Sequence, residues 1–370
     1  MKILEVIKHL ETFAPPVLQE SYDNSGLLAG DGDWECTGIL VTLDSTEEVI
    51  IEAIEKGCNL VVAHHPIIFG GLKKLNGKNY VEKTIIKSIK HDIAIYAIHT
   101  NLDNIKTGVN ARMAEKLGLV NCKVLLPKGD LLRKLAVYVP EKHAEAVRTA
   151  VFKAGAGNVG HYSECSFNIP GTTTFKPGEE THPFIGTPGK MEESSEIKIE
   201  VLYPAWLEGQ ILNAMINAHP YEEVAYDIIS LINPFQDTGS GMIGELKEPI
   251  EDKDFLNLIA DVFKLKVIKH SRLTKTKIKK VALCGGAGSF LINKALDAEV
   301  DMYITADMKY HEYFDANEKI ILVDIGHYES EQYTIDLLYD IIHEKYPTFA
   351  VQKTETQTNP VNYHFNHSSA

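Results

Sequence analysis

Three short segments of the chain bring together the kinds of side chain that bind metal ions. They are AHHP with His64 and His65, HTNLD with His99 and Asp103, and GHYESE with His327 and Glu331. Each segment follows a short apolar run of the length of a buried strand. Residues four apart share one face of a helix, so His327 and Glu331 can converge on one point. Imidazoles and carboxylates at such strand ends predict a metal site.

Each cluster also has a structural interpretation when it is taken alone. A His-His pair can be a satisfied surface pair, HTNLD can form a simple Asx turn, and an H-x-x-x-E spacing arises by chance in many helices. The joint pattern favours a metal, because three such clusters follow three separate predicted strands. Without an ion, these polar side chains would lie uncompensated beside an apolar sheet.

The kinds of donor restrict the metal. A ligand set of three imidazoles and two carboxylates from these clusters, without a thiolate, suits zinc first and also Mn, Fe, Co or Ni, and it disfavours Cu(I) and iron–sulfur clusters. One catalytic zinc takes about three protein ligands, so five ligands suit two divalent ions about 3.5–4 Å apart. Such a pair activates water and stabilises charge on a carbonyl, ring carbon or phosphoryl group.

Two stretches alternate between strand and helix signals, which predicts parallel sheets with helices on both faces. The first runs from about 38 to 126 and the second from about 281 to 345, where a long helix over 329–345 is expected. The two stretches can be aligned with each other. LVTLDST then matches VALCGGAGS in position, NLVVAHHP matches VDMYITADM, and AIYAIHTNLD matches ILVDIGHYESE. We therefore expect two similar α/β halves whose strand ends combine into one site.

The region between the two halves has a different pattern. A strand and a helix, a long hairpin, and then a strand, a helix and a strand are typical of a ferredoxin-like α+β module. The fold class is therefore α/β, with a split domain of residues 1–127 and 246–370 and an inserted α+β domain of residues 128–245. The polar tail after Thr354 is expected to be partly disordered.

Composition narrows the classes of function. The 370 residues carry 37 Lys and Arg against 51 Asp and Glu, a net charge of −14. This balance argues against a nucleic-acid partner, which needs a basic face. The five cysteines show no CxxC pair, and no stretch reaches 18 apolar residues. We expect a cytoplasmic protein without a disulfide framework or a membrane span.

The motifs AHHPIIF, IHTNLD, TADMKYH and GHYESE, with YDNSGLLAG near the N-terminus, resemble the signatures of the Nif-three-like family. Its bacterial members are called GTP cyclohydrolase 1 type 2 homologs, and the resemblance covers nearly the whole chain. It implies a two-metal site and a toroidal homohexamer. Carried over residue by residue, the implied metal ligands are His64, His65, Asp103, His327 and Glu331. One departure is Ala306, where the family usually has glycine.

The inserted region has a resemblance of its own. ECSFNIPGTTTFKPGEETHPFIG and HPYEE are similar to the PII-like or CutA-like module of the longer bacterial members.

Other residues lie near the expected metal site in the sequence pattern. Asp44 or Asp307 could orient a metal-bound histidine. His99 and His311 are candidates for a general acid or base, with a structural role equally open. CGGAGSF could offer backbone N–H groups to a phosphate, although a structural turn is favoured.

The leading functional hypothesis is a dinuclear metal enzyme that adds water to a small phosphorylated or heterocyclic metabolite. GTP as the substrate rests on the resemblance alone. The alternatives are a metal-binding or metal-delivery protein without turnover and a regulatory assembly whose insert senses a small molecule. Turnover by metal-loaded protein would separate the first hypothesis from the other two.

Overall fold

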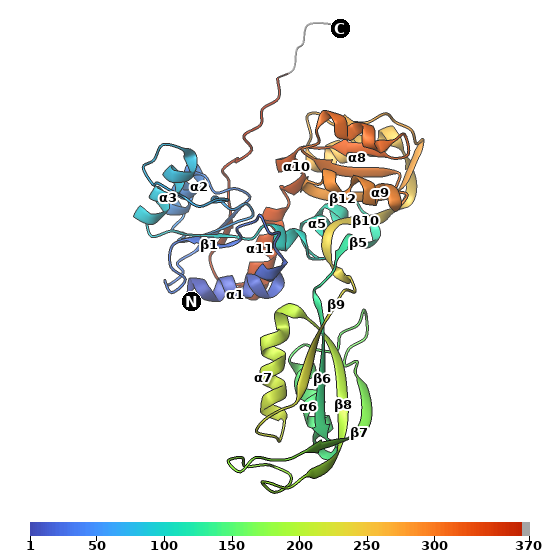
Figure 1. The fold of residues 1–370 in the computed structure, drawn as a ribbon. Helices are drawn as coiled ribbons and strands as arrows, with labels where there is room; N and C mark the ends of the chain where they lie inside the picture. Colours follow the sequence, from blue (N-terminus) through green and yellow to red (C-terminus); the bar gives the residue numbers. More distant parts are fainter. Residues whose placement is uncertain (365–370) are drawn as a thin grey trace. The chain divides into compact units, whose positions relative to one another are not determined.

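The computed structural model describes residues 1–364, which form two compact units (Figure 1). The first unit joins Met1–Pro127 to the chain from Gln236 onward, and the second is Lys128–Phe235. The second unit therefore ends at Phe235, before residue 245, where the sequence predicted the end of the inserted domain. The reason is strand β10 (Phe235–Glu251), whose residues from Met242 onward pair with a strand of the first unit.

The first sheet of the first unit has the strand order β1-β4-β3-β2-β15. Its strands are β1 (Gly26–Ala29), β2 (Ile39–Thr42), β3 (Leu60–Ala63), β4 (Ala94–Ala97) and β15 (Val351–Lys353). Strands β2, β3 and β4 are parallel and buried at every position, as their continuous apolar sequences predict. Helices α2 (Glu47–Glu55), α3 (Tyr80–Lys90) and α11 (Thr334–Lys345) pack on its strands, and α1 (Ile3–Phe13) packs on α11 (Figure 1).

The second sheet has the order β11-β14-β13-β12-β10-β5. Besides β10, its strands are β5 (Val120–Lys128), β11 (Lys269–His270), β12 (Lys277–Ala287), β13 (Met302–Ala306) and β14 (Ile321–Asp324). Two hydrophobic clusters hold helices against it. One includes residues of α5 (Val109–Lys116) and α8 (Asp252–Phe263), and the other includes residues of α9 (Ile292–Asp297) and the 3-10 helix η5 (Tyr310–Ala316).

The two sheets repeat one arrangement, which confirms the prediction of two similar halves. Parallel strands stand in the order β4-β3-β2 in one sheet and β14-β13-β12 in the other. An antiparallel edge strand flanks each set, β1 beside β4 and β11 beside β14. The carboxyl ends of equivalent strands therefore carry equivalent segments of the sequence, as the alignment of the motifs indicated.

The long helix expected over 329–345 is broken, so that prediction was wrong. The structure has α10 (His327–Glu331) and then α11, which begins at Thr334. Helix α10 packs on β12 and β13 of the second sheet, whereas α11 packs on β2 and β15 of the first. The break redirects the chain from one sheet to the other, which a single straight helix could not do.

The second unit is a four-stranded antiparallel sheet with two helices. Its strand order is β7-β8-β6-β9, and the elements follow the chain as βαββαβ, the ferredoxin-like arrangement that the sequence predicted. They are β6 (Leu132–Pro140), α6 (Ala144–Lys153), β7 (Phe167–Phe175), β8 (Glu192–Pro204), α7 (Glu208–Ala218) and β9 (Tyr226–Leu231). Apolar residues of β6 and β8 pack against α6 and α7 to form its core.

The tail after β15 makes specific contacts. The backbone N–H groups of Glu355 and Thr356 donate to the carboxylate of Glu52, and the Thr358 hydroxyl donates to Asp44 at 2.7 Å. The expected disorder therefore does not apply to these positions, and residues 365–370 lie outside the described part of the chain. Within residues 1–364, no helix is both long and apolar enough to cross a bilayer.

Candidate metal centre

His64 directly follows β3 and is fully buried. Its Nδ1 lies 2.9 Å from the carbonyl oxygen of Ile98. Because a carbonyl only accepts hydrogen bonds, Nδ1 must donate, and the neutral ring then presents a lone pair at Nε2. Burial lowers the pKa of His64 to about 3, so the ring is neutral at neutral pH.

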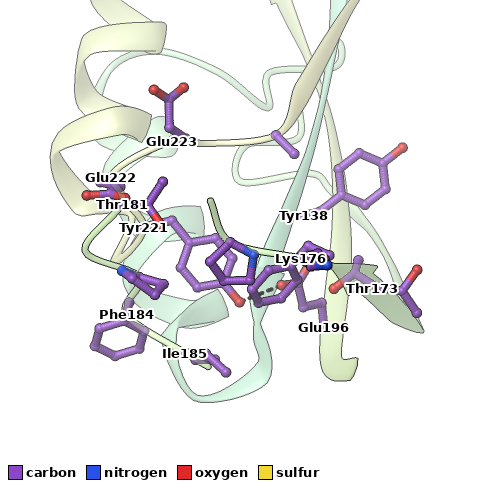
Figure 2. A pocket seen from close by; sticks show the side chains of 15 residues that line it. Tyr138, Thr173, Lys176, Thr181, Phe184, Ile185, Glu196, Tyr221, Glu222 and Glu223 are labelled. Atoms are coloured by element: carbon purple, nitrogen blue, oxygen red, sulfur yellow. Dashed lines mark hydrogen bonds between the residues drawn. The ribbon is translucent and has the colours of Figure 1, made fainter. Parts of the chain in front are cut away.

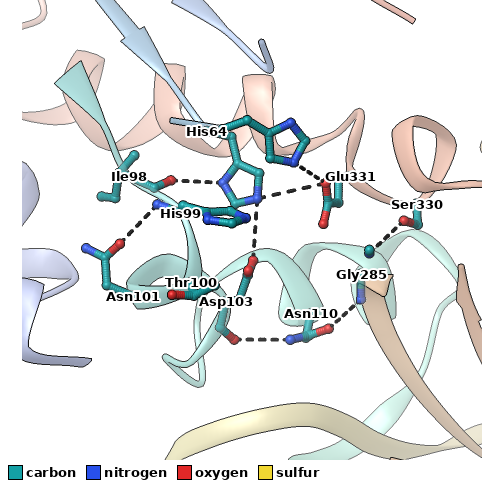
Figure 3. Close-up of polar contacts among 12 residues, drawn as sticks. His64, Ile98, His99, Thr100, Asn101, Asp103, Asn110, Gly285, Ser330 and Glu331 are labelled. Carbon is teal, nitrogen blue, oxygen red and sulfur yellow. Dashed lines mark hydrogen bonds and ion pairs between the residues drawn. The ribbon is translucent and has the colours of Figure 1, made fainter. Parts of the chain in front are cut away.

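The lone pair of His64 has no hydrogen-bond partner among the described residues. Its Nε2 lies 3.6 Å from Oδ1 of Asp103 and 4.0 Å from Oε2 of Glu331. Figure 3 draws both contacts as dashed lines. Oδ1 of Asp103 is also buried without a partner. A buried lone pair that faces carboxylate oxygens is costly unless a cation lies between them. These atoms fit a divalent metal ion.

A second set of donors faces the same carboxylate. Nε2 of His65 lies 2.9 Å from Oε2 of Glu331, and Nε2 of His327 lies 3.2 Å from it. The two imidazole Nε2 atoms are 3.3 Å apart. One proton can join each histidine to Glu331, but two protonated nitrogens this close would repel each other. A metal ion satisfies all three atoms at once.

Carboxylates behind two of these rings fix their orientation. Nδ1 of His65 lies 2.7 Å from Asp44, and Nδ1 of His327 lies 2.6 Å from Asp307. The expectation that Asp44 or Asp307 orients a histidine of the site is confirmed for both. Each carboxylate accepts the Nδ1 proton, which turns the Nε2 lone pair toward the centre, the usual arrangement around metal-binding histidines.

The charges of the centre favour a cation. Burial alone would lower the pKa of His65, but Glu331 and Asp44 outweigh it and raise the pKa to about 10. Burial would also lower the pKa of His327, but its contacts with Asp307 and Glu331 outweigh this effect and raise the pKa to about 11. Burial and the charge of Glu331 raise the pKa of Asp103. The carboxylates therefore stabilise positive charge at the Nε2 positions, which a metal ion can supply.

The potential donor atoms form three overlapping groups in which all atoms lie within 4.8 Å of one another. The groups are His64, Asp103 and Glu331; His65, His327 and Glu331; and His64, His65 and His99. The first two share Glu331. All five residues that the resemblance implied as ligands fall in these two groups, and His99 completes the third.

His99 is held by a carboxylate that sequence reasoning missed. Nδ1 of His99 lies 2.8 Å from Asp23, whose other oxygen accepts from the backbone N–H and the hydroxyl of Thr100. Burial alone would raise the pKa of Asp23, but these contacts outweigh it and hold the pKa well below its ordinary value. The only signal for Asp23 was its place in the YDNSGLLAG element, to which no role was assigned.

His311 lies outside the three donor groups. It is exposed on η5, where its ring contacts those of Tyr310 and Phe314. Of the two candidates for a general acid or base, the structure therefore places His99 beside His64 and His65, with ring centroids 5.2 and 5.3 Å away. It does not place His311 in such a group.

The glycine-rich turn CGGAGS forms one wall of the centre. Its backbone N–H groups donate within the protein, from Gly285 to Asn110, from Gly286 to Ser330 and from Gly288 to Thr305. These three N–H groups bond within the protein, which supports the structural interpretation of the turn that the sequence favoured. Gly286 has a φ of +61°, and a Cβ there would meet Oε1 of Glu331 at 2.5 Å. The turn fixes the space that the Glu331 carboxylate occupies.

The fold and the motifs have known relatives. The family model described as Duf34/NIF3 (NGG1p interacting factor 3) matches residues 1–360. A Halalkalibacterium halodurans protein named GTP cyclohydrolase 1 type 2 homolog is 42% identical over 324 residues, 87% of each chain. A Bacillus subtilis protein of the same name is 38% identical and covers 97% of this chain and 98% of its own. The crystal structure of a Bacillus cereus protein related to NIF3 matches with a TM-score of 0.87 at 38% identity, covering 98% and 99% of the two chains.

Proposed function

This chain belongs to the Duf34/NIF3 family, and from that membership and the geometry of the centre we propose that it is a metal-dependent hydrolase with two divalent ions. The observation that carries the proposal is the position of Glu331. Its Oε2 faces one donor group that contains His64 and Asp103 and another that contains His65 and His327. One carboxylate can thus bridge two ions, each with two further protein ligands.

In this proposal, the donor groups would hold divalent ions, which would supply a polarised water and stabilise negative charge on the attacked group. The protein residues orient and transfer protons. Asp44 and Asp307 keep the Nε2 atoms of His65 and His327 directed inward. We assign proton transfer to His99, because it lies beside the proposed ligands and Asp23 fixes its Nδ1.

The donor set favours zinc, with Mn, Fe, Co or Ni as alternatives. The substrate class is a small phosphorylated or heterocyclic metabolite, and the name of the relatives makes GTP the first compound to test. We further propose that the protein works in the cytoplasm as a homohexamer, with the inserted domain as a separate module.

The test combines metal content with turnover. Protein purified without chelator or affinity tag is analysed for metals and then assayed against GTP and a panel of phosphate esters. Asp103→Asn keeps the shape of the side chain but weakens the ligand, whereas Asp315→Asn makes the same change on the exposed surface of η5.

We expect metal-dependent turnover in the wild type and in Asp315→Asn, and loss of both bound metal and turnover in Asp103→Asn. Full metal content in Asp103→Asn would contradict the assigned site. Stoichiometric metal in the wild type without turnover would instead support metal binding or delivery without catalysis.

A further inference from the structure

The second unit contains a cavity of about 460 Å³ that is separate from the residues of the metal centre. Figure 2 shows it among the end of β7, the segment over 176–185 and the HPYEE segment that follows α7. Its volume suits a metabolite-sized ligand. The HPYEE motif has no role in the metal centre, so its contribution here requires an explanation of its own.

Aromatic rings form much of the lining. The ring centroid of Tyr221 lies 6.1 Å from that of Phe175 and 6.2 Å from that of Phe184. Tyr138, Pro177, Pro183, Ile185 and three threonines add to the walls. Faces of aromatic rings attract cations and pack against flat or alkylated groups.

A buried carboxylate lies in this aromatic cavity. Glu196 is only 4% exposed, and its Oε1 accepts a hydrogen bond of 2.7 Å from the Tyr221 hydroxyl. An ionised carboxylate can accept about four hydrogen bonds. None of the ion pairs found within residues 1–364 includes Glu196. A buried carboxylate without a cationic partner is costly, and a positively charged ligand would compensate it.

The HPYEE segment fixes the walls in advance. His219 is buried; its Nε2 donates to the Tyr138 carbonyl oxygen at 3.0 Å, and its Nδ1 accepts from the backbone N–H of Tyr221 at 3.1 Å. Burial lowers the pKa of His219, which keeps the ring in the neutral form that this pattern requires. Glu222 accepts from the backbone N–H of His182 and so ties the 176–185 segment to the wall.

The lining charges select the sign of the ligand. Three acidic residues, Glu196, Glu222 and Glu223, are among the residues that line the cavity, against one basic residue, Lys176. An anionic ligand would be repelled by this balance. We propose that the cavity binds a small organic cation, an amidinium, guanidinium or substituted ammonium group, with its nitrogen on Glu196 and its body among the rings.

Three isosteric probes test the proposal on the full-length protein. Benzamidinium carries a flat cation, benzamide is neutral and benzoate is anionic, while all three have the same ring. We expect saturable binding of benzamidinium, measured by calorimetry or by saturation-transfer NMR, and binding at least roughly tenfold weaker for the other two, because they lose the charge-assisted contact.

Two variants and a control locate the binding. Glu196→Gln removes the charge and should weaken benzamidinium binding roughly tenfold or more, and Tyr221→Phe should weaken it a few-fold. Glu193→Gln makes the same charge change on the same strand but does not line the cavity, and it should bind like the wild type. Metal content should be unchanged in all three variants, which separates this proposal from that for the metal centre.

Several results would overturn the proposal. They are the absence of saturable benzamidinium binding to the wild type, equal binding of benzamide or benzoate, and wild-type affinity in a folded Glu196→Gln variant. Circular dichroism establishes folding. If Glu196→Gln does not fold, the three probes and Tyr221→Phe decide the question by themselves.

Discussion

Glu331 is the residue on which both proposed ions depend, because its Oε2 faces donors of both groups. Glu331→Gln should therefore reduce metal content more than a substitution at His64 or His327, each of which belongs to one of the two proposed ion sites. The measurement is metal analysis of protein purified without chelator.

The matched control for this prediction is Glu329→Gln. Glu329 lies on the same short helix and contacts Asn359 rather than the donor groups. We expect it to retain metal. Equal metal content in Glu331→Gln and Glu329→Gln would rule out a bridging role for Glu331.

Gly286 allows a second prediction at the scale of a residue. Gly286→Ala places a Cβ against the Glu331 carboxylate, whereas Gly57→Ala, at a φ of +69°, meets nothing within 4 Å. Both should cost about 1–2 kcal/mol of unfolding free energy for the left-handed backbone. The carboxylate can move, so only Gly286→Ala should also lose metal, as chemical denaturation with metal analysis would show. Full metal content in Gly286→Ala would contradict the prediction.

Local spacing singled out the three clusters AHHP, HTNLD and GHYESE, because strand ends and i,i+4 pairs are visible in a sequence. The family resemblance then implied which five side chains of these clusters are the ligands. Other residues of the centre could not be assigned in this way. Asp23 reaches His99 from 76 positions away, and Gly286 touches Glu331 only through the packing of the turn. Such contacts depend on tertiary structure, for which the sequence carries no local signal.

At the scale of elements, helix α2 anchors the tail through Glu52. Its carboxylate accepts from Lys56, from the hydroxyls of Thr354 and Thr356, and from the backbone N–H groups of Glu355 and Thr356. Burial would raise the pKa of Glu52, but these donors outweigh it and lower the pKa from 4.5 to about 2. The folded protein therefore stabilises the ionised form.

The sign of the pH dependence follows from this lowered pKa. The contribution of Glu52 to stability is complete above pH 4.5 and is lost as the pH falls toward 2. Glu52→Gln should cost about 2 kcal/mol near neutral pH, because one amide cannot accept all these donors, and it should flatten the loss of stability in acid.

Denaturant titrations at several pH values measure this effect. Glu55→Gln, on the exposed side of the same helix, is the control and should behave like the wild type. An acid dependence unchanged in Glu52→Gln would contradict the prediction.

The apolar pattern of the sequence predicted the bounds of an element well where that element belongs to, or packs on, a single sheet along its whole length. Strands β2, β3 and β4, for example, fall on continuous apolar runs within the stretch from about 38 to 126 and are buried at every position. The break between α10 and α11 could not be predicted, because the residues from His327 to Lys345 continue a helical pattern across it. The two helices pack on different sheets, and that packing overrides local propensity.

At the scale of the whole molecule, the inserted unit should be removable. Pro127 lies close to Gly239, so a short linker can join Pro127 to Gln236. Deleting Lys128–Phe235 should leave a folded protein that binds metal, because all the donors lie outside this range. A deletion extended to residue 245 should be less stable, since it removes residues of β10 that pair with β12. Insoluble or metal-free protein from the shorter deletion would count against a modular insert.

Assembly gives the last prediction. Six chains of net charge −14 carry about −84 in total, so a hexamer must overcome considerable repulsion. Salt near 0.1 M screens charges beyond about 10 Å, and we expect assembly to persist or to increase from low to moderate salt. Light scattering should report about six chain masses. A mass of one chain under both conditions would contradict the proposed homohexamer and would leave the proposal for the metal centre unaffected.

The donor residues of the centre are encoded near opposite ends of the messenger RNA. His65 and Glu331 are 266 positions apart, and both are needed for the second donor group. At elongation rates of about 5–20 residues per second, a ribosome needs roughly 13–53 s to pass from one codon to the other. The first histidines are thus made well before their carboxylate partner, and a chain that stops early never completes the site. If the proposed metal site is correct, metal bound at this centre marks a chain whose translation has passed Glu331.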